Sequence, residues 1–82
     1  MAQAAILRTM LKKKATQTRV KLGATVRRLR QERNWSQERL AELAGLHPNY
    51  VGGIERGERN VAIDNIEKLS KAFGLSVKDL FE

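Results

Sequence analysis

Cysteine is absent from this sequence of 82 residues, and proline, histidine and tryptophan each occur once. Without cysteine the chain has no disulfide, no thiolate metal ligand and no thiol nucleophile. The single histidine, His47, cannot form a metal cluster by itself, and no residues resemble a nucleophile with its base or a pair of catalytic carboxylates. The sequence therefore predicts a protein that is not an enzyme and that needs no metal or other cofactor.

Long apolar runs are also missing. The longest, residues 4–7, is far shorter than the roughly 20 residues that cross a bilayer, so we expect no membrane contact and a cytoplasmic location. A chain of 82 residues forms one domain, because chains divide into several cores only at greater lengths. With 41% hydrophobic and 30% charged residues, the composition is typical of a globular protein.

Acidic residues are scarce in the first part of the chain, where residues 1–34 hold ten Lys or Arg and a single acid, Glu32. Residues 35–82 hold six basic and eight acidic residues, so charges of +9 and −2 make up the net charge of +7. A small basic protein indicates a polyanionic partner, because each basic side chain set on a phosphate releases counterions. Nucleic acid is the first candidate and anionic lipid the second, while solubility alone is the alternative explanation.

Apolar residues recur at helical spacing along most of the chain, and no strand pattern is convincing. We expect helices over residues 21–33, 37–44 and 48–56, a fourth between the loop at 57–60 and Gly74, and a short last helix capped by Ser76. The side chains expected to face the core are Leu22, Val26, Leu29, Trp35, Leu40, Ala41, Leu43, Ala44, Val51, Ile54, Ile63, Ile66, Leu69, Ala72 and Phe73.

Residues 1–20 are interpreted as a basic N-terminal extension, and residues 21–82 as the folded domain. The extension carries apolar residues at helical spacing between Ile6 and Leu11, followed by lysines at 12–14. An additional N-terminal helix and a frayed basic leader are both compatible with this pattern.

The helices expected at 37–44 and 48–56 have the arrangement that lets the second helix enter the major groove of DNA. Gly45 supplies a positive φ at the turn, Ala41 is small enough for a close crossing, and Val51 fixes the second helix to the core. An ordinary helical hairpin has similar spacing, so the arrangement alone leaves both interpretations open.

Two segments strongly resemble the Xre/Cro-type helix-turn-helix family of phage repressors and bacterial regulators: SQERLAELAGL at residues 36–46 and YVGGIERG at residues 50–57. The resemblance covers residues 21–82. Within the family, GIERGERN at residues 53–60 is similar to the controller proteins of restriction-modification systems, which are compact homodimers that regulate their own operon and the endonuclease gene. The resemblance implies an all-α, five-helix, lambda-repressor-like domain and a transcriptional regulator that binds double-stranded DNA sequence-specifically.

The positions that match the family carry the expected DNA contacts. They are Ser36, Gln37, Arg39, His47, Pro48, Asn49, Tyr50, Arg59 and Asn60. Ser36 and the helix amides hold a phosphate, Gln37 contacts the backbone, and Arg39 gains a phosphate contact where relatives often complete a capping box. His47, Pro48 and Asn49 match the positions at which the family makes its first phosphate and base contacts.

Asn49 is the residue best suited to read a base, because its amide pairs with adenine N6 and N7. Tyr50 either reaches a phosphate or thymine methyl or is half-buried against the preceding helix. Arg59 and Asn60 match positions near the DNA backbone or the minor groove, although a solvated turn has the same composition.

Glu55 is expected to have a structural role. It matches a glutamate that the family pairs with an arginine at the position of Arg30, so we expect a partly buried ion pair.

Gly52 and Gly53 offer DNA no side chain at the later contact positions, so DNA shape and bendability should carry much of the specificity.

A homodimer on an inverted-repeat operator is expected, because one helix with so few base contacts cannot select one site in a genome. The interface candidates are the outer face of the fourth helix with Leu75, Val77, Leu80 and Phe81. RNA polymerase is an additional expected partner. The alternative function is an antitoxin-like module that neutralises a partner protein, and RNA binding is disfavoured because aromatic residues make up only 5% of the chain.

Overall fold

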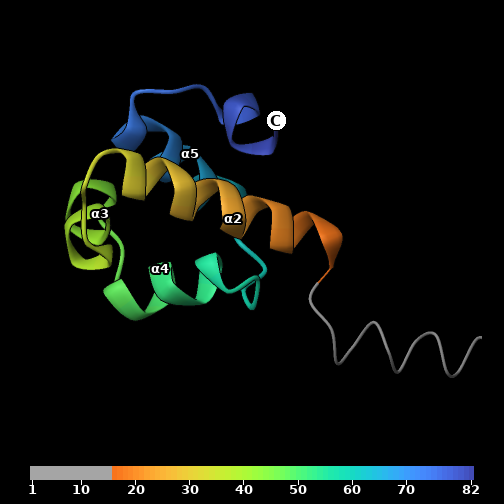
Figure 1. Cartoon of the computed structure of the whole chain (residues 1–82). Coiled ribbons are helices and arrows are strands. Elements are labelled where there is room, and N and C mark those ends of the chain that lie inside the picture. The colour runs from red at the N-terminus through yellow and green to blue at the C-terminus, as the bar shows by residue number, and fades with distance from the viewer. Residues whose placement is uncertain (1–15) are drawn as a thin grey trace, which may run out of the picture.

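The computed structural model describes residues 16–82, which contain helices and no strand. The elements are α2 (Gln17–Glu32), α3 (Gln37–Ala44), α4 (Pro48–Glu55), α5 (Ile63–Phe73) and the 3-10 helix η1 (Val77–Phe81). Figure 1 shows α2 in the middle, with α4 on one side and α5 with η1 on the other. The all-α class is confirmed, with η1 as the fifth expected helix; the additional helix expected before residue 16 lies outside the described residues.

Local capping determines where the helices begin. Thr16, Ser36 and His47 each accept a backbone N–H of the following turn, at 3.2, 3.0 and 3.0 Å. Gly45 and Gly74 end α3 and α5 with φ of 70° and 73°, a conformation that costs glycine little. The boundaries predicted for α3 and the start predicted for α4 are correct, whereas α2 begins at Gln17, four residues before the expected start at 21.

The core lies between α2, the α3–α4 pair and the α5–η1 pair. It consists of Leu22, Val26, Leu29, Leu40, Ala41, Ala44, Val51, Ile54, Ile66, Leu69, Phe73 and Leu80. Two expected core residues are corrected: Leu43 is 41% exposed and Ile63 is 67% exposed. Leu43 lies beside the buried side of α3, which consists of Leu40, Ala41 and Ala44. Ile63 is the first residue of α5, about one turn before Ile66, which is buried in the core.

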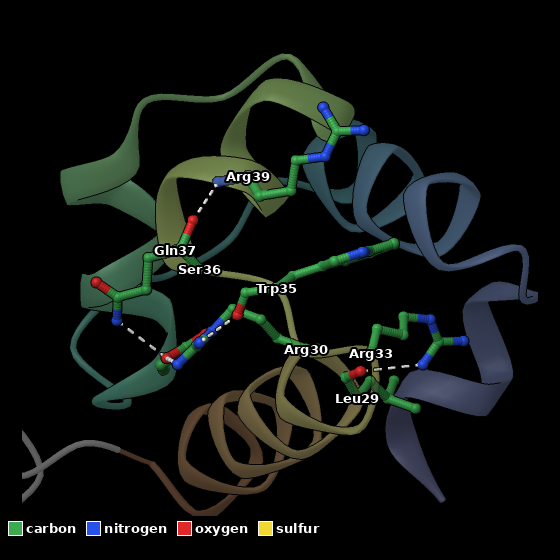
Figure 2. A network of polar contacts seen from close by, with 8 residues as sticks. Leu29, Arg30, Arg33, Trp35, Ser36, Gln37 and Arg39 are labelled. Atoms are coloured by element: carbon green, nitrogen blue, oxygen red, sulfur yellow. Dashed lines mark hydrogen bonds and ion pairs between the residues drawn. The ribbon is translucent and has the colours of Figure 1, made fainter.

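Trp35 links the α2–α3 connection to α5. Its half-buried ring stacks on Phe73, with 5.8 Å between ring centroids and 8° between planes. The Arg33 guanidinium lies 5.0 Å from the Phe73 centroid and donates to the carbonyl oxygens of Leu29 and Phe73, both at 3.0 Å. Trp35 therefore packs against the core as expected, with Phe73 of α5 as its aromatic partner. Figure 2 shows the Trp35 ring beside the Arg33 side chain, which donates to the Leu29 carbonyl.

Among residues 16–82, no helix is long and apolar enough to span a membrane.

Candidate nucleic-acid interface

Helices α3 and α4 form a helix-turn-helix around Gly45. The turn is closed by the Leu46 N–H, which donates to the Ala41 carbonyl at 2.8 Å. Pro48 occupies the first turn of α4, where its missing N–H has no intrahelical partner to lose. Buried Leu40 and Val51, both 0% exposed, join the pair to the core, and Asn49 on the first turn of α4 is exposed.

A buried ion pair connects α2 to the end of α4. Arg30 Nε and Nη2 donate to Glu55 Oε2 and Oε1 at 2.6 and 3.0 Å, and the two side chains are 13% and 3% exposed. These hydrogen bonds raise the pKa of the Arg30 guanidinium above its ordinary value. Arg30 Nη1 also donates to the Trp35 carbonyl at 2.8 Å, so the pair fixes the connection into α3 as well.

Gln37, the first residue of α3, joins this pair. Its Nε2 donates to Glu55 Oε1 at 3.0 Å, and its side chain is half-buried (Figure 2). No pattern within either segment indicates this contact, because Gln37 and Glu55 come from different helices. The structure brings together Arg30, Gln37 and Glu55 as one polar network.

Ser36, Arg39 and His47 are exposed at the beginnings of α3 and α4. Ser36 Oγ accepts the Arg39 N–H, which leaves its own hydroxyl proton free for an acceptor. The Arg39 side chain forms an exposed ion pair with Glu42. His47 Nδ1 accepts the Asn49 N–H at 3.0 Å, which leaves Nε2 as the ring nitrogen that can donate to a ligand.

The remaining expected contacts lie on α4 and the loop that follows it. Asn49 is exposed and Pro48 is half-buried, while Arg59 and Asn60 are exposed in the loop. Tyr50 is half-buried, and its hydroxyl oxygen accepts Asn65 Nδ2 at 3.2 Å. Its hydroxyl proton is available to a further acceptor. Asn65, in α5, was missed by the sequence analysis because nothing in its own segment indicates this contact.

Gly52 and Gly53 are buried, and polar side chains lie beside both of them. A β-carbon at Gly52 would lie 3.1 Å from Arg56 Nη1 and 3.4 Å from Gln37 Oε1. One at Gly53 would lie 2.9 Å from Arg59 Nε, whose guanidinium is 5.7 Å from the Tyr50 ring centroid. Gly52 and Gly53 have no side chain of their own to offer DNA, and three polar side chains, those of Gln37, Arg56 and Arg59, lie beside them. Arg56 was not expected there.

In residues 16–82, no group of three or more His, Cys, Asp or Glu is placed to hold a metal ion. The available chemistry consists of hydrogen-bond donors and positive charge around the first turn of α4 and the loop after it, which defines a helix-turn-helix DNA-binding protein.

Comparison with known proteins identifies the family. The family model described as "Helix-turn-helix", HTH_3, matches residues 26–80, and the chain belongs to this family. The chain is 51% identical over 65 residues to control protein C.BamHI of Bacillus amyloliquefaciens, covering 78% of this chain and 80% of that protein. Control protein C.SmaI of Serratia marcescens is 48% identical over 59 residues, covering 72% and 70%.

A solved structure shows the same relationship. The crystal structure of the restriction-modification controller protein C.AhdI from Aeromonas hydrophila superposes with a TM-score of 0.75 and 49% identity, covering 77% of this chain and 96% of that one. These matches confirm the resemblance inferred from residues 36–57, and the protein is a DNA-binding transcription regulator.

Proposed function

We propose that this protein is a cytoplasmic controller of a restriction-modification operon, which binds an inverted-repeat operator as a homodimer. The observation that carries the proposal is the helix-turn-helix whose outward side chains are polar and whose α4 is fixed by the Arg30–Glu55 pair. The similarity to control proteins C.BamHI and C.SmaI supports the proposal that the regulated genes form a restriction-modification operon. Regulation then follows from covering or bending promoter DNA and from contact with RNA polymerase.

The side chains divide into two kinds of contact. Ser36, Arg39 and His47 offer donors or charge at the beginnings of helices, which suits phosphates and fixes the register of the protein on DNA. Asn49 is exposed on the first turn of α4 and offers the amide edge that pairs with adenine.

The first turn of α4 and the loop after this helix supply the other proposed contacts. Tyr50 presents its hydroxyl proton to a phosphate, and Pro48 packs beside the sugar-phosphate backbone without a polar contact. Arg59 and Asn60 reach the backbone or the minor groove from the loop. Arg59 is held over α4 by Tyr50 and Gly53, which favours a contact there over a freely solvated turn.

A homodimer is proposed because a single α4 offers too few base contacts to select one genomic site. Exposed apolar side chains support it: Ile63 and Phe81 are 67% and 42% exposed, and Leu75 and Val77 are half-buried. Leu80, also expected at the interface, is 0% exposed and belongs to the core.

The proposal is tested with a fluorescent duplex that carries the DNA upstream of the protein's own gene, against a scrambled duplex of equal length and composition. At physiological salt, anisotropy should show at least 1,000-fold tighter binding to the upstream duplex, about the lower limit for specific regulators. Mass photometry or sedimentation of the complex should give two chains per operator. Equal affinity for both duplexes would contradict the proposal.

A further inference from the structure

The chain before α2 is basic. Residues 1–15 contain Arg8, Lys12, Lys13 and Lys14 and no acidic residue. These residues lie outside the described part of the chain, but the point where they join the domain is described, because Thr16 caps α2. The position of Thr16 therefore fixes where the basic segment is attached.

The start of α2 lies beside the loop that follows α4. A β-carbon at Gly57 would lie 3.2 Å from Val20 Cγ2 and 3.3 Å from Val20 Cα, so the first turns of α2 contact this loop (Figure 1). The Val20 N–H donates to the Thr16 carbonyl at 3.0 Å, which places Thr16 about 6 Å along the helix axis before that contact. Arg59, a proposed DNA contact, comes two residues after Gly57. The basic segment is therefore attached close to the proposed DNA contacts of the loop.

Covalent geometry limits how far the three lysines can be from Thr16. Lys12, Lys13 and Lys14 precede Thr16 by two to four residues. Because four residues span at most about 14 Å, the α-carbons of all three lysines lie within that distance of the start of α2. This distance corresponds to about four base pairs at 3.4 Å each, so the lysines can reach phosphates just outside a half-site.

The end of the domain beside this segment offers the lysines no open acidic partner. Glu58, in the loop beside α2, already pairs with Arg56 at 3.0 Å. Arg19 and Lys21, in the first turns of α2, form no ion pair within residues 16–82, so the positive charge continues from the segment into the helix. This excess of positive charge favours an external polyanion, and DNA is the polyanion proposed to lie beside this end of the domain.

We propose that Lys12, Lys13 and Lys14 bind phosphates of the DNA that flanks each half-site, and so extend the interface beyond the helix-turn-helix. The proposal rests on the proposed binding of an operator by this protein. Contacts of this kind add affinity and position the protein without recognising bases.

The test compares two duplexes with the same operator, which the wild-type protein recovers from a random-sequence library. One duplex ends at the outer edges of the half-sites, and the other carries about one helical turn of further DNA on each side. The segment variant carries Lys12→Gln, Lys13→Gln and Lys14→Gln, and a charge-conserving variant carries Lys12→Arg, Lys13→Arg and Lys14→Arg.

A control variant loses the same charge at exposed positions of α5 and η1, which lie on the other side of α2 from α4 (Figure 1). It carries Lys68→Gln, Lys71→Gln and Lys78→Gln. Melting temperatures and the number of chains in each complex are measured for all variants and should equal those of the wild type.

At physiological salt the wild type should bind the longer duplex about 10-fold more tightly than the shorter one, and the segment variant should bind both equally. Each lysine on a phosphate contributes about 0.9 to the slope of log affinity against log salt, so this slope should fall by up to about 5 for the six lysines of a dimer. The control variant and the charge-conserving variant should both keep the gain from flanking DNA.

A segment variant that gains as much as the wild type from flanking DNA would overturn the proposal. An equal loss in the control variant would also overturn it, because net charge alone would then explain the effect. If the segment variant instead loses binding only to vesicles of anionic phosphatidylglycerol, the lysines bind a lipid surface and the proposal is wrong. If the wild type recovers no preferred duplex, the proposed function itself fails, and this inference with it.

Discussion

Replacing Glu55 with alanine tests the buried network most severely. The variant removes the acceptor of Arg30 Nε and Nη2, now at 2.6 and 3.0 Å, while Arg30 stays only 13% exposed. A buried charge that loses its partner costs about 3 to 5 kcal/mol. Because small domains have free energies of unfolding of about 5 to 15 kcal/mol, Glu55→Ala should remove a large part of the stability.

The assay is urea denaturation followed by tryptophan fluorescence. Trp35 is the only tryptophan, and its ring is half-buried on Phe73, so unfolding changes its environment. Glu32→Ala is the matched control, because Glu32 pairs with Arg28 at 3.1 Å and the two side chains are 54% and 56% exposed. The control should lose less than about 1 kcal/mol, as exposed ion pairs do.

A double variant distinguishes the cost of burying an unpaired charge from the net contribution of the ion pair to the free energy of unfolding. Replacing both residues by apolar side chains, Arg30→Met with Glu55→Leu, should recover most of the stability lost in Glu55→Ala. A loss of less than about 1 kcal/mol in Glu55→Ala would contradict this prediction, because it would mean that Arg30 finds other partners or water.

Three further predictions concern recognition, assembly and pH. Asn49→Ala should keep its melting temperature and relax the selected DNA sequence at one adenine per half-site, and an unchanged sequence would exclude this contact. Ile63→Glu should convert the dimer to a folded monomer in sedimentation velocity, whereas a wild type that is monomeric at all concentrations would contradict the dimer. Hydrogen bonds from the Ser76 hydroxyl and N–H lower the pKa of Asp79 below its ordinary value of 3.8. A carboxyl with a lowered folded-state pKa stabilises the fold above its unfolded pKa and loses this effect as pH falls, so the melting temperatures of the wild type and Asp79→Asn should differ at pH 7 and converge below about pH 4. A difference that persists at pH 2 would argue against this cap.

Elements with local signals could be predicted from the sequence. Ser36, Gly45 and Pro48 mark where α3 begins, where it ends and where α4 begins, because capping, positive φ and the fixed φ of proline act within one turn. The start of α2 was missed because Thr16 caps a first turn that has no apolar periodicity to reveal it.

Contacts between elements could not be predicted in the same way. The exposure of Ile63 depends on where α5 meets the core, which the spacing of apolar residues along α5 does not specify. The space beside Gly52 and Gly53 is filled partly by Gln37, which the fold brings from α3, and by Arg59, which it brings from the loop after α4. Sequence periodicity describes each helix alone, whereas these features arise from how the helices pack.

Sequence-specific recognition by α4 is best tested by selection from a random duplex library at physiological salt, followed by sequencing of the bound fraction. If α4 of a homodimer recognises DNA sequence, two inverted half-sites about one helical turn apart should be enriched. Binding without enrichment, with an affinity that collapses as salt rises, would show instead that the protein neutralises phosphates without recognising sequence.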